Sequence, residues 1–187
     1  MKLAKDKHVV MAADFAGYPL AQAVKGYLQD NGWTVEDMTP VKEDIPMFHR
    51  VGFMLGAKIA EKEYEKGLLF CGTGMGIHLA AAKVPHVHAA VCESVRSAKR
   101  CATGNNCNVM AMGALWIAPN LGYAMAEAFL TSEFCEGYED WEGFYEWHEI
   151  GYREIDEFDY EAFKASGFKV VDEPRIDMAP WPKDLPY

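Results

Sequence analysis

Short apolar runs alternate with amphipathic stretches through the first 130 residues of the chain. A compact apolar run is typical of a buried strand, and apolar residues that recur every three or four positions are typical of a helix. The pattern predicts strands at 8–14, 33–38, 68–71, 88–92 and 108–112, and helices at about 20–29, 46–66, 79–82, 95–102 and 121–130. Because strands that alternate with helices form a parallel sheet covered on both faces, we expect a three-layer α/β fold with five parallel strands.

The composition changes at Ser132, after which acidic and aromatic residues alternate. Such a segment has too many aromatic side chains for a disordered acidic tail. We therefore expect an α/β domain over residues 1–131 and an appendage over 132–187 that packs on the core or on a partner subunit. The appendage is expected to contain a helix at about 155–165 and an irregular segment at 177–187.

Charge and cysteine content limit the classes of function. The formal net charge of −10 argues against nucleic acid or an anionic membrane as the main partner. The five cysteines are an odd number without metal-ligand spacing, and no signal peptide or membrane-spanning apolar run is recognisable. We expect a cytoplasmic protein with reduced thiols.

A glycine-rich loop between a predicted strand and a predicted helix is the most distinctive feature. Cys71 ends the strand, and Gly72, Gly74 and Gly76 alternate with Thr73 and Met75 behind it. Unpaired N–H groups at the helix start can bind an anion, and glycines let the backbone approach it closely. A cysteine beside these groups is more easily deprotonated than a free one, so it can act as a base or nucleophile. The alternative is a buried cysteine in a structural turn.

Three familiar loop motifs do not match this stretch. A dinucleotide-binding fingerprint requires glycine at position 77, which is Ile77, and a P-loop requires Gly-Lys-Ser/Thr. A cysteine phosphatase would need arginine where Ile77 stands. What remains is an anion-binding loop with a thiol at its mouth. Ligands of parallel α/β sheets bind at the carboxyl ends of the strands, where the sequence places Asp14, Cys71, Glu93 and Gly113.

Several segments resemble the ribose-5-phosphate isomerase B and galactose-6-phosphate isomerase family over about residues 8–130. The resemblance is carried by Cys71-Gly72-Thr73-Gly74-Met75-Gly76, by Ala80-Ala81-Ala82-Lys83-Val84-Pro85, by 105–113 and by Asp14-Phe15-Ala16-Gly17-Tyr18. It implies a flavodoxin-like or Rossmann-like fold, and a homodimer or homotetramer with sites at subunit contacts. It also implies aldose–ketose isomerisation of a phosphorylated sugar through an enediolate, with neither a metal nor another cofactor.

The resemblance assigns roles to individual residues. Cys71 would transfer the proton, and the N–H groups of Gly72, Gly74 and Gly76 would stabilise the oxyanion. Thr73 would help to open the sugar ring by proton relay. Asp14, Phe15 and Asn105 would contact the substrate.

The chain departs from the family pattern at four places. Phe15 and Gly104 stand where the family has histidines, and Ile45 stands near a common tyrosine. The arginines that grip phosphate have no clear match in 134–141. His49 is then a candidate for ring opening, Arg96 and Arg153 are candidates for binding phosphate, and His78 is a further candidate for the site, although each can equally be an ordinary surface or structural residue.

Three hypotheses follow from these departures. The default is isomerisation of ribose 5-phosphate. The second is isomerisation of another tetrose, pentose or hexose phosphate, and the third is a sugar-phosphate-binding protein without turnover. Loss of the ring-opening histidine favours a substrate with much open-chain form, such as a tetrose 4-phosphate, and predicts a roomier, more apolar pocket.

Overall fold

The computed structural model describes residues 1–170, which form two compact units. The first unit is Met1–Phe134, and the second begins at Cys135. Each is described separately below. The segment 177–187, expected to be irregular, lies outside the described residues.

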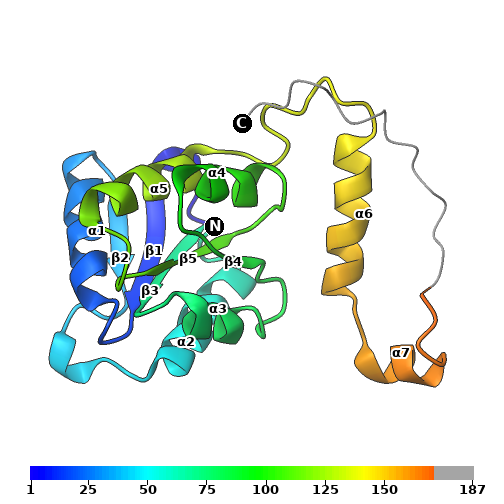
Figure 1. The fold of residues 1–187 in the computed structure, drawn as a ribbon, viewed down its shortest axis with the longest axis horizontal. Helices are drawn as coiled ribbons and strands as arrows, with labels where there is room; N and C mark the ends of the chain where they lie inside the picture. Colours follow the sequence, from blue (N-terminus) through cyan, green and yellow to red (C-terminus); the bar gives the residue numbers. More distant parts are fainter. Residues whose placement is uncertain (171–187) are drawn as a thin grey trace. The chain divides into compact units, whose positions relative to one another are not determined.

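The first unit is built on the predicted five-stranded parallel sheet (Figure 1). The strands are β1 His8–Ala13, β2 Thr34–Asp37, β3 Gly67–Cys71, β4 Ala89–Val91 and β5 Val109–Gly113. Their order is β2-β1-β3-β5-β4, and all neighbours are parallel. The α/β prediction is confirmed. β5 lies between β3 and β4, so its end is next to the end of β3.

Alternate residues of each strand enter two different cores. Val9, Met11 and Ala13 of β1 belong to the core beneath α1, α4 and α5, whereas Val10 and Ala12 belong to the core beneath α2 and α3. This follows from the two-residue period of a strand. The helices are α1 Tyr18–Asp30, α2 Phe48–Ala60, α3 Met75–Ala81, α4 Val95–Thr103 and α5 Pro119–Thr131, with 3₁₀ turns at Ala4–Asp6 and Lys42–Asp44.

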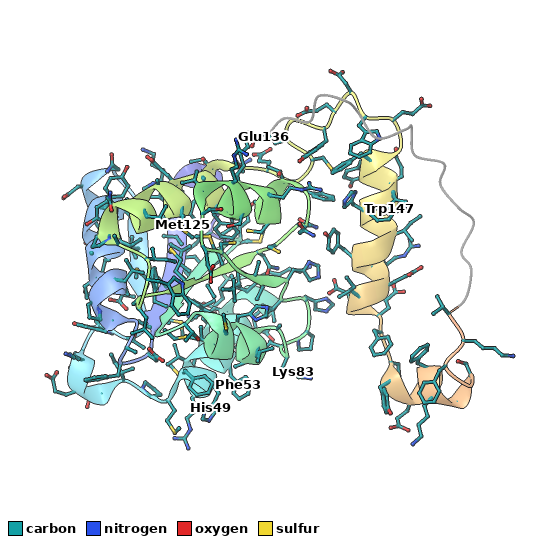
Figure 2. All side chains as sticks on the ribbon, viewed as in Figure 1. His49, Phe53, Lys83, Met125, Glu136 and Trp147 are labelled. Atoms are coloured by element: carbon teal, nitrogen blue, oxygen red, sulfur yellow. The ribbon has the colours of Figure 1, made fainter. Side chains whose placement is uncertain are left out.

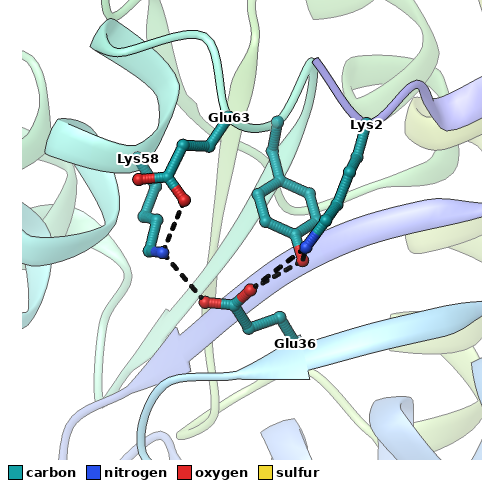
Figure 3. A network of polar contacts seen from close by, with 5 residues as sticks. Lys2, Glu36, Lys58 and Glu63 are labelled. Carbon is teal, nitrogen blue, oxygen red and sulfur yellow. Dashed lines mark hydrogen bonds and ion pairs between the residues drawn. The ribbon is translucent and has the colours of Figure 1, made fainter.

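The helix expected over 46–66 is shorter than predicted and ends at Ala60. The chain then turns back to the N-terminal segment: Lys2 donates its N–H to the carbonyl of Glu63 at 2.8 Å, and its carbonyl accepts from Glu65 at 3.0 Å. Tyr64 is buried there, and its hydroxyl donates to Glu36 Oε2 at 2.7 Å. Lys2, Lys58 and Glu63 complete this network (Figure 3). It joins β2, α2 and the N-terminus.

Two other helix boundaries differ from those predicted. The helix after the glycine loop begins at Met75 rather than near 79, because Gly74 already adopts the left-handed conformation that starts it. The single helix expected at 155–165 is two helices, α6 Phe144–Asp156 and α7 Tyr160–Ala165. Asp159 separates them by capping α7, since its Oδ1 accepts from the N–H of Ala162 at 2.9 Å.

A small aromatic cluster organises the second unit. Tyr138 stacks on Phe144 with ring centroids 4.3 Å apart, and Trp141 packs beside both rings. His148, one turn along α6, lies 4.0 Å from the Phe144 ring centroid, and its Nδ1 is 2.7 Å from the Phe144 carbonyl. These contacts explain why a segment so rich in acids is ordered. Within residues 1–170, no helix is long and apolar enough to cross a membrane.

Candidate functional site

The carboxyl ends of β1, β3 and β5 bring three of the predicted residues side by side. Cys71 ends β3 and is in register with Gly113, which ends β5. Asp14 directly follows β1 and donates its backbone N–H to the carbonyl of Phe70 at 2.9 Å. Glu93 follows β4, which is separated from β3 by β5. The centre of the site is therefore Cys71, between the ends of two neighbouring strands.

Glycines let the loops at this edge approach one another more closely than side chains would allow. A Cβ on Gly17 would lie 2.2 Å from the carbonyl carbon of Phe70, and one on Gly113 would lie 2.8 Å from the Thr73 carbonyl. Gly74 has φ +77°, and its Cβ would lie 3.1 Å from the Met112 carbonyl carbon. The three loops are therefore packed backbone against backbone around Cys71.

The Cys71 thiol is buried and receives a backbone hydrogen bond. The N–H of Gly74 donates to Sγ at 3.0 Å, and the carbonyl of Cys71 accepts from Ala114 at 2.9 Å. A donor aimed at sulfur stabilises a thiolate. Gly74 therefore has two roles: its backbone adopts the left-handed conformation of the turn, and its N–H donates to the cysteine.

Two further side chains line the glycine loop. Thr73 Oγ1 accepts from the N–H of Met75 at 3.2 Å, which leaves the hydroxyl proton to donate elsewhere. Phe48, the first residue of α2, covers Gly76, where a Cβ would lie 2.8 Å from the ring. The sequence analysis did not single out Phe48. Its contact joins residues 28 positions apart, and local spacing carries no signal for such a contact.

The Asp14 carboxylate is hydrogen-bonded within its own turn. Its Oδ1 accepts from the N–H of Gly17 at 2.7 Å, just before α1. Burial raises the pKa of Asp14 above its ordinary value, and hydrogen bonds from Gly17 and Ala16 partly oppose this shift. The adjacent Phe15 is 65% exposed, with Lys42 Nζ 4.8 Å from its ring centroid. The Phe15 side chain therefore lies on the surface, next to the turn that holds Asp14.

The other histidine and arginine candidates are dispersed over the chain. His49 lies on α2, where its ring packs edge to face against Phe48 and Phe53 (Figure 2). His78 is half-buried on α3, and Arg96 is exposed on α4. Arg153 lies on α6, in the second unit. The two aromatic partners of His49, Phe48 and Phe53, are themselves exposed on the surface of α2.

Asn105 lies at the amino ends of the parallel strands, whereas Cys71 lies at their carboxyl ends. It follows α4 and precedes β5, and the nearby Asn108 carbonyl accepts from Gly67, the first residue of β3, at 2.9 Å. The five residues of β5 span about 16 Å. One chain therefore does not bring Asn105 to its own Cys71.

The space beside Gly104 is filled. Gly104 is buried at the end of α4, and the guanidinium of Arg100, one turn earlier, occupies the position that a side chain at 104 would need. The expected roomier pocket is therefore not found at this position. Arg100 was missed because the sequence shows only that a side chain is absent at 104, and not which neighbour fills the space.

Comparison with known proteins agrees with this geometry. The model of the Ribose/Galactose Isomerase family matches residues 9–142. A 4-deoxy-4-sulfo-D-erythrose isomerase from Clostridium sp. is 38% identical over 71% of this chain and 84% of its own length. A D-erythrulose-4-phosphate isomerase from Pectobacterium atrosepticum is 36% identical over 69% of this chain and 86% of its own.

A solved structure shares the architecture as well. Ribose 5-phosphate isomerase from Thermotoga maritima superposes with a TM-score of 0.71 at 28% identity, covering 81% of this chain and 98% of that one. The strand order, the glycine loop after β3 and these matches agree. The chain therefore belongs to the ribose/galactose isomerase family, as an aldose–ketose isomerase of sugar phosphates.

Proposed function

We propose that the substrate is a four-carbon sugar with a terminal phosphate or sulfonate, rather than ribose 5-phosphate. The observation that carries this proposal is the pair of relatives at 36–38% identity, both named for four-carbon substrates. The ribose 5-phosphate isomerase structure is more distant, at 28% identity.

Position 104 gives independent support. A histidine there would serve to open a sugar ring, and here Gly104 and the Arg100 guanidinium take its place. A tetrose 4-phosphate cannot close a furanose ring because its terminal hydroxyl carries the phosphate. Such a substrate needs no ring-opening acid, so its enzyme can dispense with the histidine.

In the proposed reaction, Cys71 is the proton-transfer group. Its thiolate takes the proton from C2 of the aldose and returns it to C1, passing through an enediolate. The Thr73 hydroxyl donates to the reacting oxygens, and the N–H groups of Gly72 and Gly76 stabilise the charge that develops there. The N–H of Gly74, expected to take part as well, is directed at the Cys71 sulfur instead. One such preorganised donor lowers the activation barrier by on the order of 3 kcal/mol.

We also propose that the active assembly is a homo-oligomer in which Asn105 enters the site of a second copy. Asn105 and Cys71 lie at opposite ends of the parallel strands in one chain, so a site that contains both needs two chains. Exposed apolar side chains on α2 and α3, which include Phe53, Met54 and Leu79, provide a surface for such a contact.

Mixing two inactive variants tests the shared site. Cys71→Ser and Asn105→Ala proteins, denatured and refolded together, should regain up to about a quarter of wild-type activity. Half of randomly formed two-fold dimers are mixed, and each mixed dimer has one intact site. If the mixture stays as inactive as its components, Asn105 does not act across the contact.

A substrate panel tests the reaction itself. The protein is incubated with tetrose, pentose and hexose phosphates in deuterated water, and solvent exchange at C1 and C2 is followed by NMR. We expect exchange and net isomerisation with the tetrose phosphate, both lost in Cys71→Ser. Exchange with none of the sugars would contradict an isomerase function for these substrates.

A further inference from the structure

Three thiols other than Cys71 form a connected cluster beneath α4. Cys92 and Cys101 belong to one buried cluster, and Cys107 packs against it. The neighbouring thiols of Cys107 and Cys92, together with burial, raise the pKa of Cys101. Cys101 Sγ also lies 3.1 Å from the carbonyl of Ala98. No group of three metal-binding side chains within residues 1–170 has the arrangement of a metal site, so the cluster points to thiol chemistry.

The backbone places Cys101 and Cys107 at the separation of a disulfide. The N–H of Cys107 donates to the carbonyl of Cys101 at 2.9 Å. Standard bond lengths and one such hydrogen bond keep the two Cα atoms within about 7 Å of each other, and bridged cysteines have Cα atoms about 4.4–6.8 Å apart. Cys92 instead donates its N–H to Ala111, a residue of β5. The backbone thus favours Cys107 over Cys92 as the partner of Cys101.

Exposure decides which thiol meets an oxidant first. Cys107 is half-buried, whereas Cys71, Cys92 and Cys101 are buried. Cys107 Sγ lies 3.7 Å from the carbonyl of Asn105, in the loop between α4 and β5. An oxidant from solvent therefore reaches this loop before it reaches the catalytic cysteine.

We propose that Cys101 and Cys107 form a reversible disulfide that ties the Asn105 loop to the end of α4. With hydrogen peroxide, the Cys107 thiol becomes a sulfenic acid and one water is released. The Cys101 sulfur then attacks the Cys107 sulfur, the S–O bond breaks, and the leaving hydroxide takes up the Cys101 proton as a second water. Two thiols and one peroxide thus give one disulfide and two waters.

The bond changes the position of the loop. Its formation holds the two sulfurs about 2.05 Å apart, closer than two thiols can approach without a bond. Cys101 is held in the core, so the loop that carries Asn105 makes most of the movement. A displacement of about 1 Å in a positioning residue can cost on the order of 100-fold in rate. This consequence for activity rests on the proposed function; the disulfide itself does not.

Differential alkylation identifies the bond. The reduced full-length protein is treated with a small excess of hydrogen peroxide and then unfolded in denaturant, so that iodoacetamide blocks buried and exposed thiols alike. It is then reduced, labelled with N-ethylmaleimide and sequenced by mass spectrometry. We expect the second label on Cys101 and Cys107 and the first on Cys71 and Cys92. Cys107→Ser or Cys107→Ala should abolish the second label on Cys101, whereas Cys135→Ser, which changes the other half-buried thiol, should not.

Activity provides a separate readout. The oxidised protein should lose at least about tenfold in kcat/KM, and dithiothreitol should restore the lost activity. Peroxide should leave the kcat/KM of the Cys107→Ser protein unchanged. A second label on Cys92 with Cys101, on Cys71, or on no cysteine would overturn the proposed pair. A disulfide that forms without changing kcat/KM would overturn its effect on the loop. A reduced protein without isomerase activity would instead contradict the proposed function.

Discussion

The guanidinium of Arg100 occupies the place of a side chain at residue 104. A Cβ on Gly104 would lie 1.3 Å from Nη1 and 2.0 Å from Cζ of Arg100. The clash is with the end of a flexible side chain, and the φ of Gly104 is −111°, which any residue can adopt. Position 104 can therefore be substituted if Arg100 moves aside, and the family histidine can be restored.

Gly104→His should shift preference toward ring-forming substrates. An imidazole at this position supplies the acid–base group that opens a furanose, which is worth about 100-fold or more in favourable cases. We expect kcat/KM for ribose 5-phosphate, relative to a tetrose 4-phosphate, to rise at least about tenfold. Gly104→Ala is the matched control because it displaces Arg100 without adding an imidazole. An equal shift in both variants would assign the effect to Arg100 instead.

Gly74→Ala should impair both folding and catalysis. The new Cβ would lie 3.1 Å from the Met112 carbonyl carbon in a backbone of φ +77°, and the change would disturb the N–H that donates to Cys71. We expect a loss of more than about 1 kcal/mol in the free energy of unfolding and a lower kcat. Gly26→Ala is the control: it lies on α1 with nothing within 4 Å of a Cβ.

Urea denaturation and initial rates decide this comparison. Gly26→Ala should gain about 0.4–1 kcal/mol in the free energy of unfolding and keep kcat. If Gly74→Ala matches it in both measurements, the left-handed turn is not required for the site.

The hydrogen bond between Tyr64 and Glu36 should make stability depend on pH. The Tyr64 hydroxyl, with Lys58 and Lys2, lowers the pKa of Glu36. A lowered carboxyl pKa stabilises the fold above the unfolded value, and this contribution is lost as the pH falls through the folded value. Tyr64→Phe should cost about 1 kcal/mol at pH 7, and less near pH 3, where protonation of Glu36 removes part of this contribution.

Urea denaturation at both pH values measures this difference, with the exposed Tyr160→Phe as control. A Tyr64→Phe cost that is the same at pH 7 and near pH 3 would show that the Glu36 carboxylate does not contribute through this bond.

The sheet and the glycine loop could be predicted from sequence because their signals are local. Apolar runs mark the strands, and Ser94 caps α4 as its residue type suggests, with Ser97 completing a capping box. The early end of α2 could not be predicted, because it depends on the pairing of Tyr64 with Lys2, 62 residues away. The division between α6 and α7 was missed although Asp159, a good capping residue, was visible.

The same distinction applies to the site. Asp14, Cys71 and Gly113 were correctly placed at strand ends, because parallel topology alone aligns them. The separation of Asn105 from Cys71 follows from the same topology, because Asn105 precedes β5 whereas Cys71 ends the parallel strand β3. Arg100 and Phe48 act by filling space beside glycines, which depends on tertiary packing.

Two truncations test the expectation that the appendage packs on the core or on a partner subunit. Lys66 Nζ donates to the carbonyls of Phe129 and Ser132, so a chain that ends at Thr131 leaves a buried ammonium short of an acceptor. A chain that ends at Phe134 keeps both acceptors. We expect the 1–131 chain to be about 1–3 kcal/mol less stable than the 1–134 chain.

If the appendage packs on the core or on a partner subunit, as the sequence analysis expects, both truncated chains should lose the native oligomer or aggregate, because apolar surface would be exposed. Light scattering and unfolding curves measure the two effects. A soluble, active 1–134 chain with an unchanged oligomeric state would mean that the appendage does not contribute to assembly.

The proposed four-carbon substrate is tested most directly by the ratio of kcat/KM for a tetrose 4-phosphate to that for ribose 5-phosphate, measured on the same wild-type preparation. A substrate that needs no ring opening, in a site with Gly104 and Arg100 in place of the histidine, should give a ratio well above one, by at least about tenfold or 1.4 kcal/mol in transition-state stabilisation. A ratio below one would contradict the proposal and would mean that another residue, such as His49, opens the ring.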